Sequence, residues 1–260
     1  MGPQNPSRAP VAIVSAMGDE LRALLGSLRE PQSVRLAGRE FHQGEIRGHP
    51  VVLALSGIGK VAAATTAVLA VHAFNARELV FTGVAGGLRR GVQVGDVVVA
   101  RQLLQHDMDA SPLFPRFEVP LTGRARFDAD AALADALAAA AQRCLDRADE
   151  LIGADHLSAF GIDGALVHQG LVVSGDRFIA SDAQSHELRE LLPDALAVEM
   201  EGAAVAQACT EFERPFAVLR TISDRADANA HVDFTRFIAE VASAYTRVIV
   251  EDWLAHLAHA

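Results

Sequence analysis

Cysteine is scarce in this sequence, since the 260 residues include only Cys144 and Cys209. Two thiols without a Cys-x-x-Cys motif or flanking histidine clusters argue against a disulfide scaffold and against a zinc site. We therefore expect both thiols to be reduced and buried, in a cytoplasmic protein.

Positive charge and long hydrophobic runs are also lacking. The 23 Lys and Arg residues are outnumbered by 33 Asp and Glu, and the net charge of −10 argues against nucleic acid or an anionic membrane as a partner. The longest apolar region, Val51–Phe74, is interrupted by polar and glycine residues at 56–60, so it predicts a strand, a turn and a helix instead of a membrane span. We expect no signal peptide and a disordered stretch over residues 1–9.

What remains is a chain of globular composition, 50% hydrophobic, in which short apolar runs alternate with longer helical patterns. This order predicts an α/β protein, a three-layer α/β/α sandwich with a mixed, largely parallel central sheet. No repeat or linker divides the chain, so we expect a single domain over residues 1–260. Residues Asp109–Asp128 are irregular and predict a long surface loop, of a kind that often lies beside a binding site.

The predicted elements follow from the periodicity of the apolar residues. Strands are predicted at Val11–Ser15, Glu40–Arg47, Pro50–Ser56, Glu78–Thr82, Val94–Ala100, Leu166–Ser174, Ala197–Glu199 and Phe216–Ser223. Helices are predicted at Gly18–Glu30, Ile58–Phe74, Ala129–Arg147, Gly202–Glu211 and Phe234–Leu257.

Polar residues follow two of the early strands. Asp19 and Glu20 begin a predicted helix, where carboxylates complement the helix dipole. That explanation is the simpler one for Asp19, whereas Glu20 suits a structural and a functional role equally well. The turn Ser56-Gly57-Ile58-Gly59-Lys60 could present amides to an anion or hydroxyl, but it matches neither a Walker loop nor GxGxxG, and an ordinary tight turn is the better explanation of this motif alone.

Two later strands end in acids. Glu199 and Glu201 are flanked on both sides by apolar residues, so at least one of them should be buried, which is costly unless it is paired or binds a ligand. Ser223 and Asp224 end an apolar strand and either project into the crevice or cap the next segment, and Arg220 could be an ion-pair partner. Ligands of open α/β sheets bind at strand ends, so these features predict one site.

The histidines do not indicate a metal site. None of the ten forms HExxH or a comparable spacing. The run His106-Asp107-Met108-Asp109 could bind a metal, but no further ligand accompanies it, so we expect no metal.

Taken together, seven collinear stretches resemble the 5′-methylthioadenosine/S-adenosylhomocysteine nucleosidases of the purine nucleoside phosphorylase superfamily. They are Ile13–Glu20, Ser56–Ala64, Thr82–Leu88, Val94–Val99, Gly170–Ile179, Ala197–Glu201 and Arg220–Asp224. The resemblance implies hydrolysis of the N-glycosidic bond of both nucleosides, a role in methionine salvage, a nucleoside phosphorylase-like fold, a homodimer and no cofactor. It places His106–Phe117 near the partner subunit.

The resemblance also implies roles for the acids. Glu20 matches the acid that activates the attacking water, and Arg220 a residue near that water. Asp224 matches the acid that protonates adenine N7, and Ser223 the residue that orients it. Glu201 matches the acid that holds the ribose 2′ and 3′ hydroxyls. A proton on N7 makes adenine a better leaving group, and an ionised base accepts the proton of water.

Other positions match contacts to the substrate. Phe178 matches the ring that stacks on adenine, and the backbone of Ile179 the group that reads the purine edge. Met17 and Met200 match apolar contacts to the sugar, and Phe234 a contact near the 5′ substituent.

The glycine-rich stretch contributes Val84 and Gly86 to the substrate site, and Val84 is a departure from the family pattern. The family often has a serine there that helps to hold the water, so we expect altered water placement or substrate preference. Gly18 also replaces a common acid. Three readings stay open: the hydrolase; a related phosphorylase, or a hydrolase of another adenine nucleoside such as aminofutalosine; and a nucleoside-binding module without catalysis. The carboxylate of Glu20 would repel a phosphate dianion and so favours the hydrolase.

Overall fold

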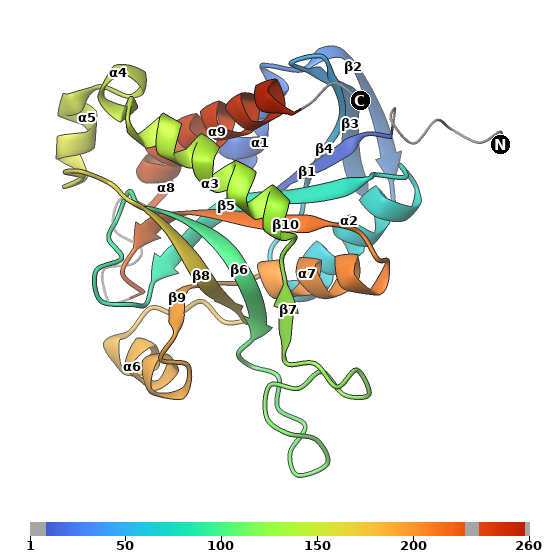
Figure 1. The fold of residues 1–260 in the computed structure, drawn as a ribbon, viewed down its shortest axis with the longest axis vertical. Coiled ribbons are helices and arrows are strands. Elements are labelled where there is room, and N and C mark those ends of the chain that lie inside the picture. Colours follow the sequence, from blue (N-terminus) through green and yellow to red (C-terminus); the bar gives the residue numbers. More distant parts are fainter. Residues whose placement is uncertain (1–8, 227–233, 258–260) are drawn as a thin grey trace.

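A ten-stranded mixed sheet forms the centre of the computed structural model, which describes residues 9–226 and 234–257 (Figure 1). Its strand order is β10-β6-β8-β9-β5-β1-β4-β3-β2, with β7 beside β6. The expected disorder of residues 1–9 lies outside the described residues except at Ala9, which is buried. The strands are β1 Val11–Ser15, β2 Arg29–Leu36, β3 Arg39–Ile46, β4 His49–Leu55, β5 Glu78–Gly87, β6 Val97–Gln105, β7 Arg126–Asp128, β8 Val167–Ser174, β9 Ala195–Glu199 and β10 Phe216–Asp224.

The sheet curls back on itself at β5. This strand pairs in parallel with β1 and β10, and its last residues, Gly86 and Gly87, pair antiparallel with Val198 and Ala197 of β9. Strands β5, β10, β6, β8 and β9 therefore form a closed ring of pairings. The closure brings the ends of β5, β9 and β10 together, which positions the polar residues at those ends.

Helices cover the sheet on both faces, which confirms the predicted three-layer α/β/α class. Helices α1, α3 and α9 pack together on one face, and α2 and α7 pack together on the other (Figure 1). Their bounds are α1 Gly18–Leu25, α2 Lys60–His72, α3 Ala131–Leu145, α4 Ala148–Leu151, α5 Ala154–Ala159, α6 Asp182–Leu191, α7 Gly202–Glu211, α8 Phe234–Phe237 and α9 Ser243–His256, with a π-helix at Ile238–Ala242.

Each face has its own apolar core. Trp253, Tyr245 and Phe237 fill the α3–α9 side, while Phe41 and Phe81 fill the α2–α7 side. Strands β1, β9 and β10 are buried at every residue, because helices cover both of their faces. Within the described ranges no helix is long and apolar enough to cross a membrane, and both cysteines are free and buried.

The structure corrects two predicted helices and contains elements that were not predicted. The helix predicted at Gly18–Glu30 ends at Leu25, because the chain turns at Gly26 and continues into the unpredicted strand β2. Helix α6 was also not predicted. The helix predicted at Phe234–Leu257 is interrupted by the π-helix. The region Asp109–Asp128 is mostly irregular, as predicted, and ends in β7.

Candidate active site

A cavity of about 170 Å³ opens where the ends of β5, β9 and β10 meet. Its walls come from segments far apart in sequence, and every predicted site residue except Glu20 and Arg220 lines it. The lining residues are Ala16, Met17, Ile58, Val84, Ala85, Gly86, Arg177, Phe178, Ile179, Val198, Glu199, Met200, Glu201, Ser223, Asp224 and Phe234.

One wall of the cavity carries the Asp224 carboxylate. Oδ2 accepts a hydrogen bond from Ser223 Oγ at 2.8 Å, and Oδ1 accepts one from the Ala226 amide at 2.7 Å. Gly86 packs directly against this group, since a Cβ there would lie 2.8 Å from Asp224 Oδ1. The absence of a side chain at position 86 thus allows the carboxylate to reach the cavity.

A second carboxylate, Glu201, stands just before helix α7. Its Oε1 accepts a hydrogen bond of 2.8 Å from the Gly59 amide. Burial, followed by the neighbouring negative charge of Glu199, raises the pKa of Glu201 to about 7, while the Gly59 amide and Arg220 oppose the rise. A carboxylate on the cavity wall with one oxygen held by an amide suits the binding of hydroxyl groups.

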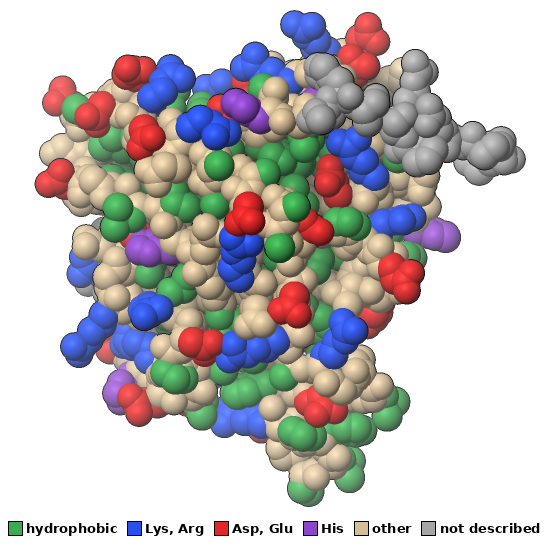
Figure 2. Space-filling view, viewed as in Figure 1, with side chains coloured by type: hydrophobic (Ala, Val, Ile, Leu, Met, Phe, Trp, Pro, Cys, Tyr) green, Lys and Arg blue, Asp and Glu red, His purple; other side chains and the backbone are tan. Residues whose placement is uncertain are grey.

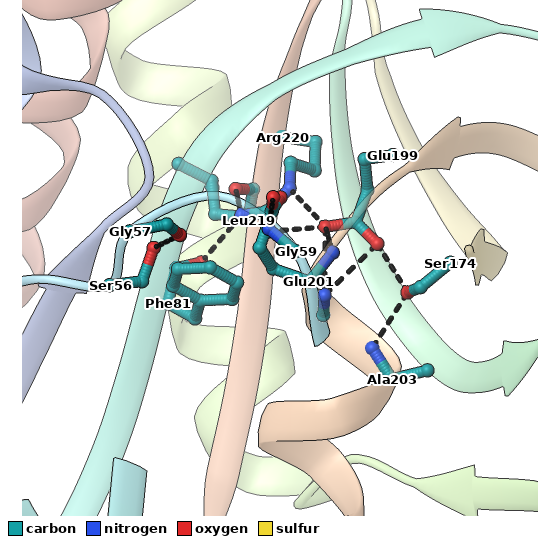
Figure 3. A network of polar contacts seen from close by, with 11 residues as sticks. Ser56, Gly57, Gly59, Phe81, Ser174, Glu199, Glu201, Ala203, Leu219 and Arg220 are labelled. Carbon is teal, nitrogen blue, oxygen red and sulfur yellow. Dashed lines mark hydrogen bonds and ion pairs between the residues drawn. The ribbon is translucent and has the colours of Figure 1, made fainter. Parts of the chain in front are cut away.

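Glu199 organises the base of the cavity, a role that the sequence analysis did not assign (Figure 3). Its carboxylate accepts hydrogen bonds from the amides of Glu201 at 3.1 Å and Gly202 at 2.8 Å, and from the hydroxyl of Ser174. The Ser174 hydroxyl in turn accepts from the Ala203 amide at 2.7 Å. These bonds fix the first turn of α7 and with it the position of Glu201.

Arg220 is fully buried and completes this network. Its NH2 group lies 2.7 Å from Glu199 Oε2, and its guanidinium stacks 4.1 Å from the centre of the Phe81 ring. A Cβ at Gly83 would lie 3.0 Å from Arg220 NH1, so the glycine makes room for the guanidinium. The charge of Arg220 also lowers the pKa of both Glu20 and Glu201, against the effect of burial.

Glu20 is not among the residues that line the cavity, and it has no exposed surface. Its Oε1 accepts a hydrogen bond of 2.8 Å from the hydroxyl of Thr246 on α9, and Oε2 has no protein partner among the described residues. Burial raises the pKa of Glu20 to about 7; the Thr246 hydroxyl and Arg220 partly offset this effect. A carboxyl group with this pKa is balanced between its two states near neutral pH, as a general base requires.

Apolar side chains form the rest of the cavity. Met17 and Met200 line it together with Val84, which offers no hydrogen-bonding group. Phe178 stands at the mouth, 49% exposed, with its ring edge-on to Phe234 at 6.4 Å between centroids. A flat aromatic ligand could stack there between apolar surfaces.

The glycine turn before α2 is held by a ring of polar contacts. The Lys60 amide donates to Asp176 Oδ1 at 2.7 Å, the Asp176 amide donates to Asp107 Oδ2 at 2.9 Å, and Lys60 Nζ lies 2.6 Å from Asp107 Oδ1. The turn at residues 56–60, which we predicted to be an ordinary tight turn, therefore positions the Gly59 amide against Glu201. It also gives Asp107 a structural role.

Comparison with known proteins shows the same architecture. A family model of the phosphorylase superfamily matches residues 10–254. The chain is 36% identical to the 5′-methylthioadenosine/S-adenosylhomocysteine nucleosidase of Neisseria meningitidis in complex with methylthio-immucillin-A, with a TM-score of 0.83 over 96% of this chain and 100% of that one. The corresponding nucleosidase of Streptococcus pneumoniae, bound to a transition-state inhibitor, is 32% identical, with a TM-score of 0.80 over 95% and 98%.

A third similar structure is an aspartate-to-asparagine mutant of the Helicobacter pylori nucleosidase with 5′-methylthioadenosine in its active site. It is 28% identical and has a TM-score of 0.81 over 96% of this chain and 99% of that one. Fold and cavity thus define an enzyme of the nucleoside phosphorylase and hydrolase class. Within this phosphorylase superfamily, the chain belongs to the family of 5′-methylthioadenosine/S-adenosylhomocysteine nucleosidases.

Proposed function

We propose that this enzyme hydrolyses the N-glycosidic bond of 5′-methylthioadenosine and S-adenosylhomocysteine, releasing adenine and the thioribose product. The observation that carries the proposal is the set of three buried acids, Glu20, Glu199 and Glu201, of which the last two line the cavity and Glu199 is paired with Arg220. The similar structures, with methylthioadenosine or its analogues bound, support this substrate class.

Asp224 acts on the base. Cleavage moves the electrons of the glycosidic bond into the purine, and a proton on N7 stabilises the leaving adenine. Asp224 would deliver that proton. Ser223 Oγ and the Ala226 amide hold its two oxygens at 2.8 and 2.7 Å, which fixes the direction of the carboxyl group. Phe178 stacks on the ring and Ile179 offers its backbone to the purine edge.

Glu20 and Glu201 act on the sugar. Glu20 in its ionised form takes a proton from the attacking water, while Arg220 keeps part of the Glu20 population ionised. Glu201 binds the 2′ and 3′ hydroxyls with the oxygen that does not face the Gly59 amide. Charge-assisted hydrogen bonds of this kind hold the ring as positive charge develops at C1′.

Charge favours water over phosphate as the nucleophile. Arg220 is the only cation paired with Glu199 in this part of the described structure, and Glu20 and Glu201 add further negative charge. At a distance of 4 Å and an effective dielectric constant of about 20, each pair of like charges is repelled by about 4 kcal/mol. A phosphate dianion would therefore be strongly disfavoured beside Glu20.

The test is a turnover assay with a panel of adenine nucleosides, with and without phosphate, in which the sugar product is identified. Free thioribose supports the hydrolase, whereas a sugar 1-phosphate would overturn it. Because Val84 is apolar, the panel includes aminofutalosine, and a strong preference for that nucleoside would replace the proposed substrates. If none of these nucleosides is turned over, the protein would instead be a nucleoside-binding module without catalysis.

Asp224→Asn tests the acid. This variant keeps the shape of the side chain but has no proton to donate, so kcat should fall by at least about 10²-fold. Asp155→Asn, on the exposed face of α5, is the matched control and should keep full activity. Equal activity in both variants would refute the role of Asp224.

We further propose that the enzyme is a homodimer. Four large apolar side chains are more than two-thirds exposed: Ile58, Val61, Leu113 and Leu121. Ile58 also lines the cavity, so a partner covering it would lie beside the nucleoside. Sedimentation of the wild type should give twice the chain mass, and Val61→Glu should give monomers. A monomeric wild type would contradict this proposal.

A further inference from the structure

A second concave surface lies next to the active site and is lined by arginines. Its volume is about 340 Å³, and Arg89, Arg90, Arg189 and Arg225 contribute to it. These residues come from the loop after β5, from α6 and from the end of β10, so the fold brings separate segments together. Figure 2 shows Lys and Arg side chains gathered at the lower left of the molecule, over and beside α6. We refer to this surface as the arginine pocket.

The positive charge of the arginine pocket is not neutralised by any ion pair within residues 9–226 and 234–257. No ion pair within the described ranges involves Arg89, Arg90 or Arg225. Asp194 lies near enough to feel the charge of Arg89, but both of its oxygens are bound to Arg126, at 2.7 and 3.2 Å. Like charges gathered without a counter-charge repel one another, and a bound anion would relieve that repulsion.

The remaining lining residues restrict the kind of ligand. They are Gly87, Leu88, Gly91, Val92 and Gln93, with no carboxylate and no aromatic ring among them. The pocket therefore offers no aromatic surface on which a base could stack. Glycines permit close approach, and guanidinium groups bind phosphate oxygens in pairs. The net charge of −10 disfavours a long nucleic acid as the occupant.

We propose that the arginine pocket binds a small phosphate-type anion with two or more negative charges. The site is separate from the nucleoside cavity, whose lining includes the acids Glu199, Glu201 and Asp224. The proposal does not depend on the reaction assigned to that cavity.

The two sites share a wall, so occupancy of one should affect the other. Gly86 and Asp224 line the nucleoside cavity, while their neighbours Gly87 and Arg225 line the arginine pocket. Helix α6 joins these segments, because Ser185 Oγ donates to the Ala226 carbonyl at 2.5 Å and Arg189 NH1 donates to the Leu88 carbonyl at 3.3 Å. An anion bound to Arg189 and Arg225 would therefore restrict the motion of the segment that carries Asp224.

Calorimetric titration of the full chain with pyrophosphate tests the proposal, in about 0.15 M KCl to screen diffuse attraction. We expect saturable binding of one pyrophosphate per chain and no binding of acetate. Arg89→Ala and Arg225→Ala should each weaken binding at least about tenfold, because each removes a charge-assisted hydrogen bond.

Arg35→Ala is the matched control, since Arg35 is an exposed arginine on β2, away from the pocket, and should bind pyrophosphate as the wild type does. The unfolding temperatures of Arg89→Ala and Arg225→Ala should equal that of the wild type, which would show that a loss of pyrophosphate binding is not caused by a loss of folding. No saturable binding, or equal weakening in the Arg35 variant, would show that only surface charge attracts the anion. A wild-type KM for the nucleoside that pyrophosphate does not change would remove the proposed link between the two sites.

Discussion

Replacing Thr246 by valine tests whether Glu20 is the base that activates water. The Thr246 hydroxyl donates to Glu20 Oε1 at 2.8 Å, and this bond favours the ionised carboxylate. Valine keeps the branched shape of threonine and removes only the donor. The pKa of Glu20, already about 7 through burial, should therefore rise further.

The size of the effect follows from the strength of that bond. A hydrogen bond to a charged group is worth about 1.5–3 kcal/mol, and about 1.4 kcal/mol corresponds to one pKa unit, so the lower end of this range gives a rise of about one unit. Near pH 7 the ionised fraction of Glu20 would fall from about a half to about a tenth. The value of kcat/KM should then drop about fivefold near pH 7 and hardly at all near pH 9.

The assay is the pH profile of kcat/KM for methylthioadenosine in the wild type, Thr246→Val and Thr246→Ser. Serine retains the hydroxyl, so its acidic limb should coincide with that of the wild type, while the limb of the valine variant moves to higher pH. Since Glu201 also has a pKa of about 7, the wild-type limb alone does not identify the base. An unmoved limb in the valine variant would refute the role of Glu20.

Three further changes test the site. Gly86→Ala should reduce kcat at least about 10²-fold, because its Cβ would lie 2.8 Å from Asp224 Oδ1; wild-type turnover would refute this close packing. Glu199→Gln should lower the unfolding free energy by about 3–5 kcal/mol in denaturant titrations, because it leaves Arg220 buried without its counter-charge; a loss below about 1 kcal/mol would contradict this. Glu20→Gln should abolish activity yet raise stability by up to about 3 kcal/mol near pH 8, because a carboxyl pKa raised from 4.5 to about 7 costs stability as pH rises through that window. Thermal unfolding should show that gain near pH 8 but not near pH 4, and an equal gain at both would refute it.

Much of the fold was predictable because the buried strands are continuous apolar runs. Val11–Ser15 and Phe216–Asp224 are buried at every residue. Because helices cover both faces of these strands, their sequences do not alternate between apolar and polar residues as a half-exposed strand does. Strand β2 gave no such signal, since nearly all of its residues are exposed and pairing with β3 alone makes it extended. Helix α6 did carry a signal, because Ser181 caps it and Gln184 bonds back to the Ala180 amide.

The site was predictable where a residue stands at the end of a strand. Asp224 and Glu201 follow apolar strands, and the resemblance to a family assigned them roles. The function of Glu199 is harder to see from sequence, because its partners Ser174 and Arg220 are brought to it only by the closed ring of strands. The pairing of Glu20 with Thr246 joins the two ends of the chain, and no local pattern reports such a contact.

The π-helical turn at Ile238–Ala242 is the place where the C-terminal helix can lose one residue without turning the side chains on either side of it. A π turn holds one residue more than an α turn, and each residue of an α-helix rotates the side chains that follow by about 100°. Phe234, before the turn, lines the cavity, and Thr246, after it, contacts Glu20. Deletion of one residue within the turn would restore a regular α-helix and nearly preserve the relative rotation of these two side chains, because the π turn holds its extra residue within a single turn. Relatives that keep both contacts should therefore have either the π turn or a regular helix that is one residue shorter here.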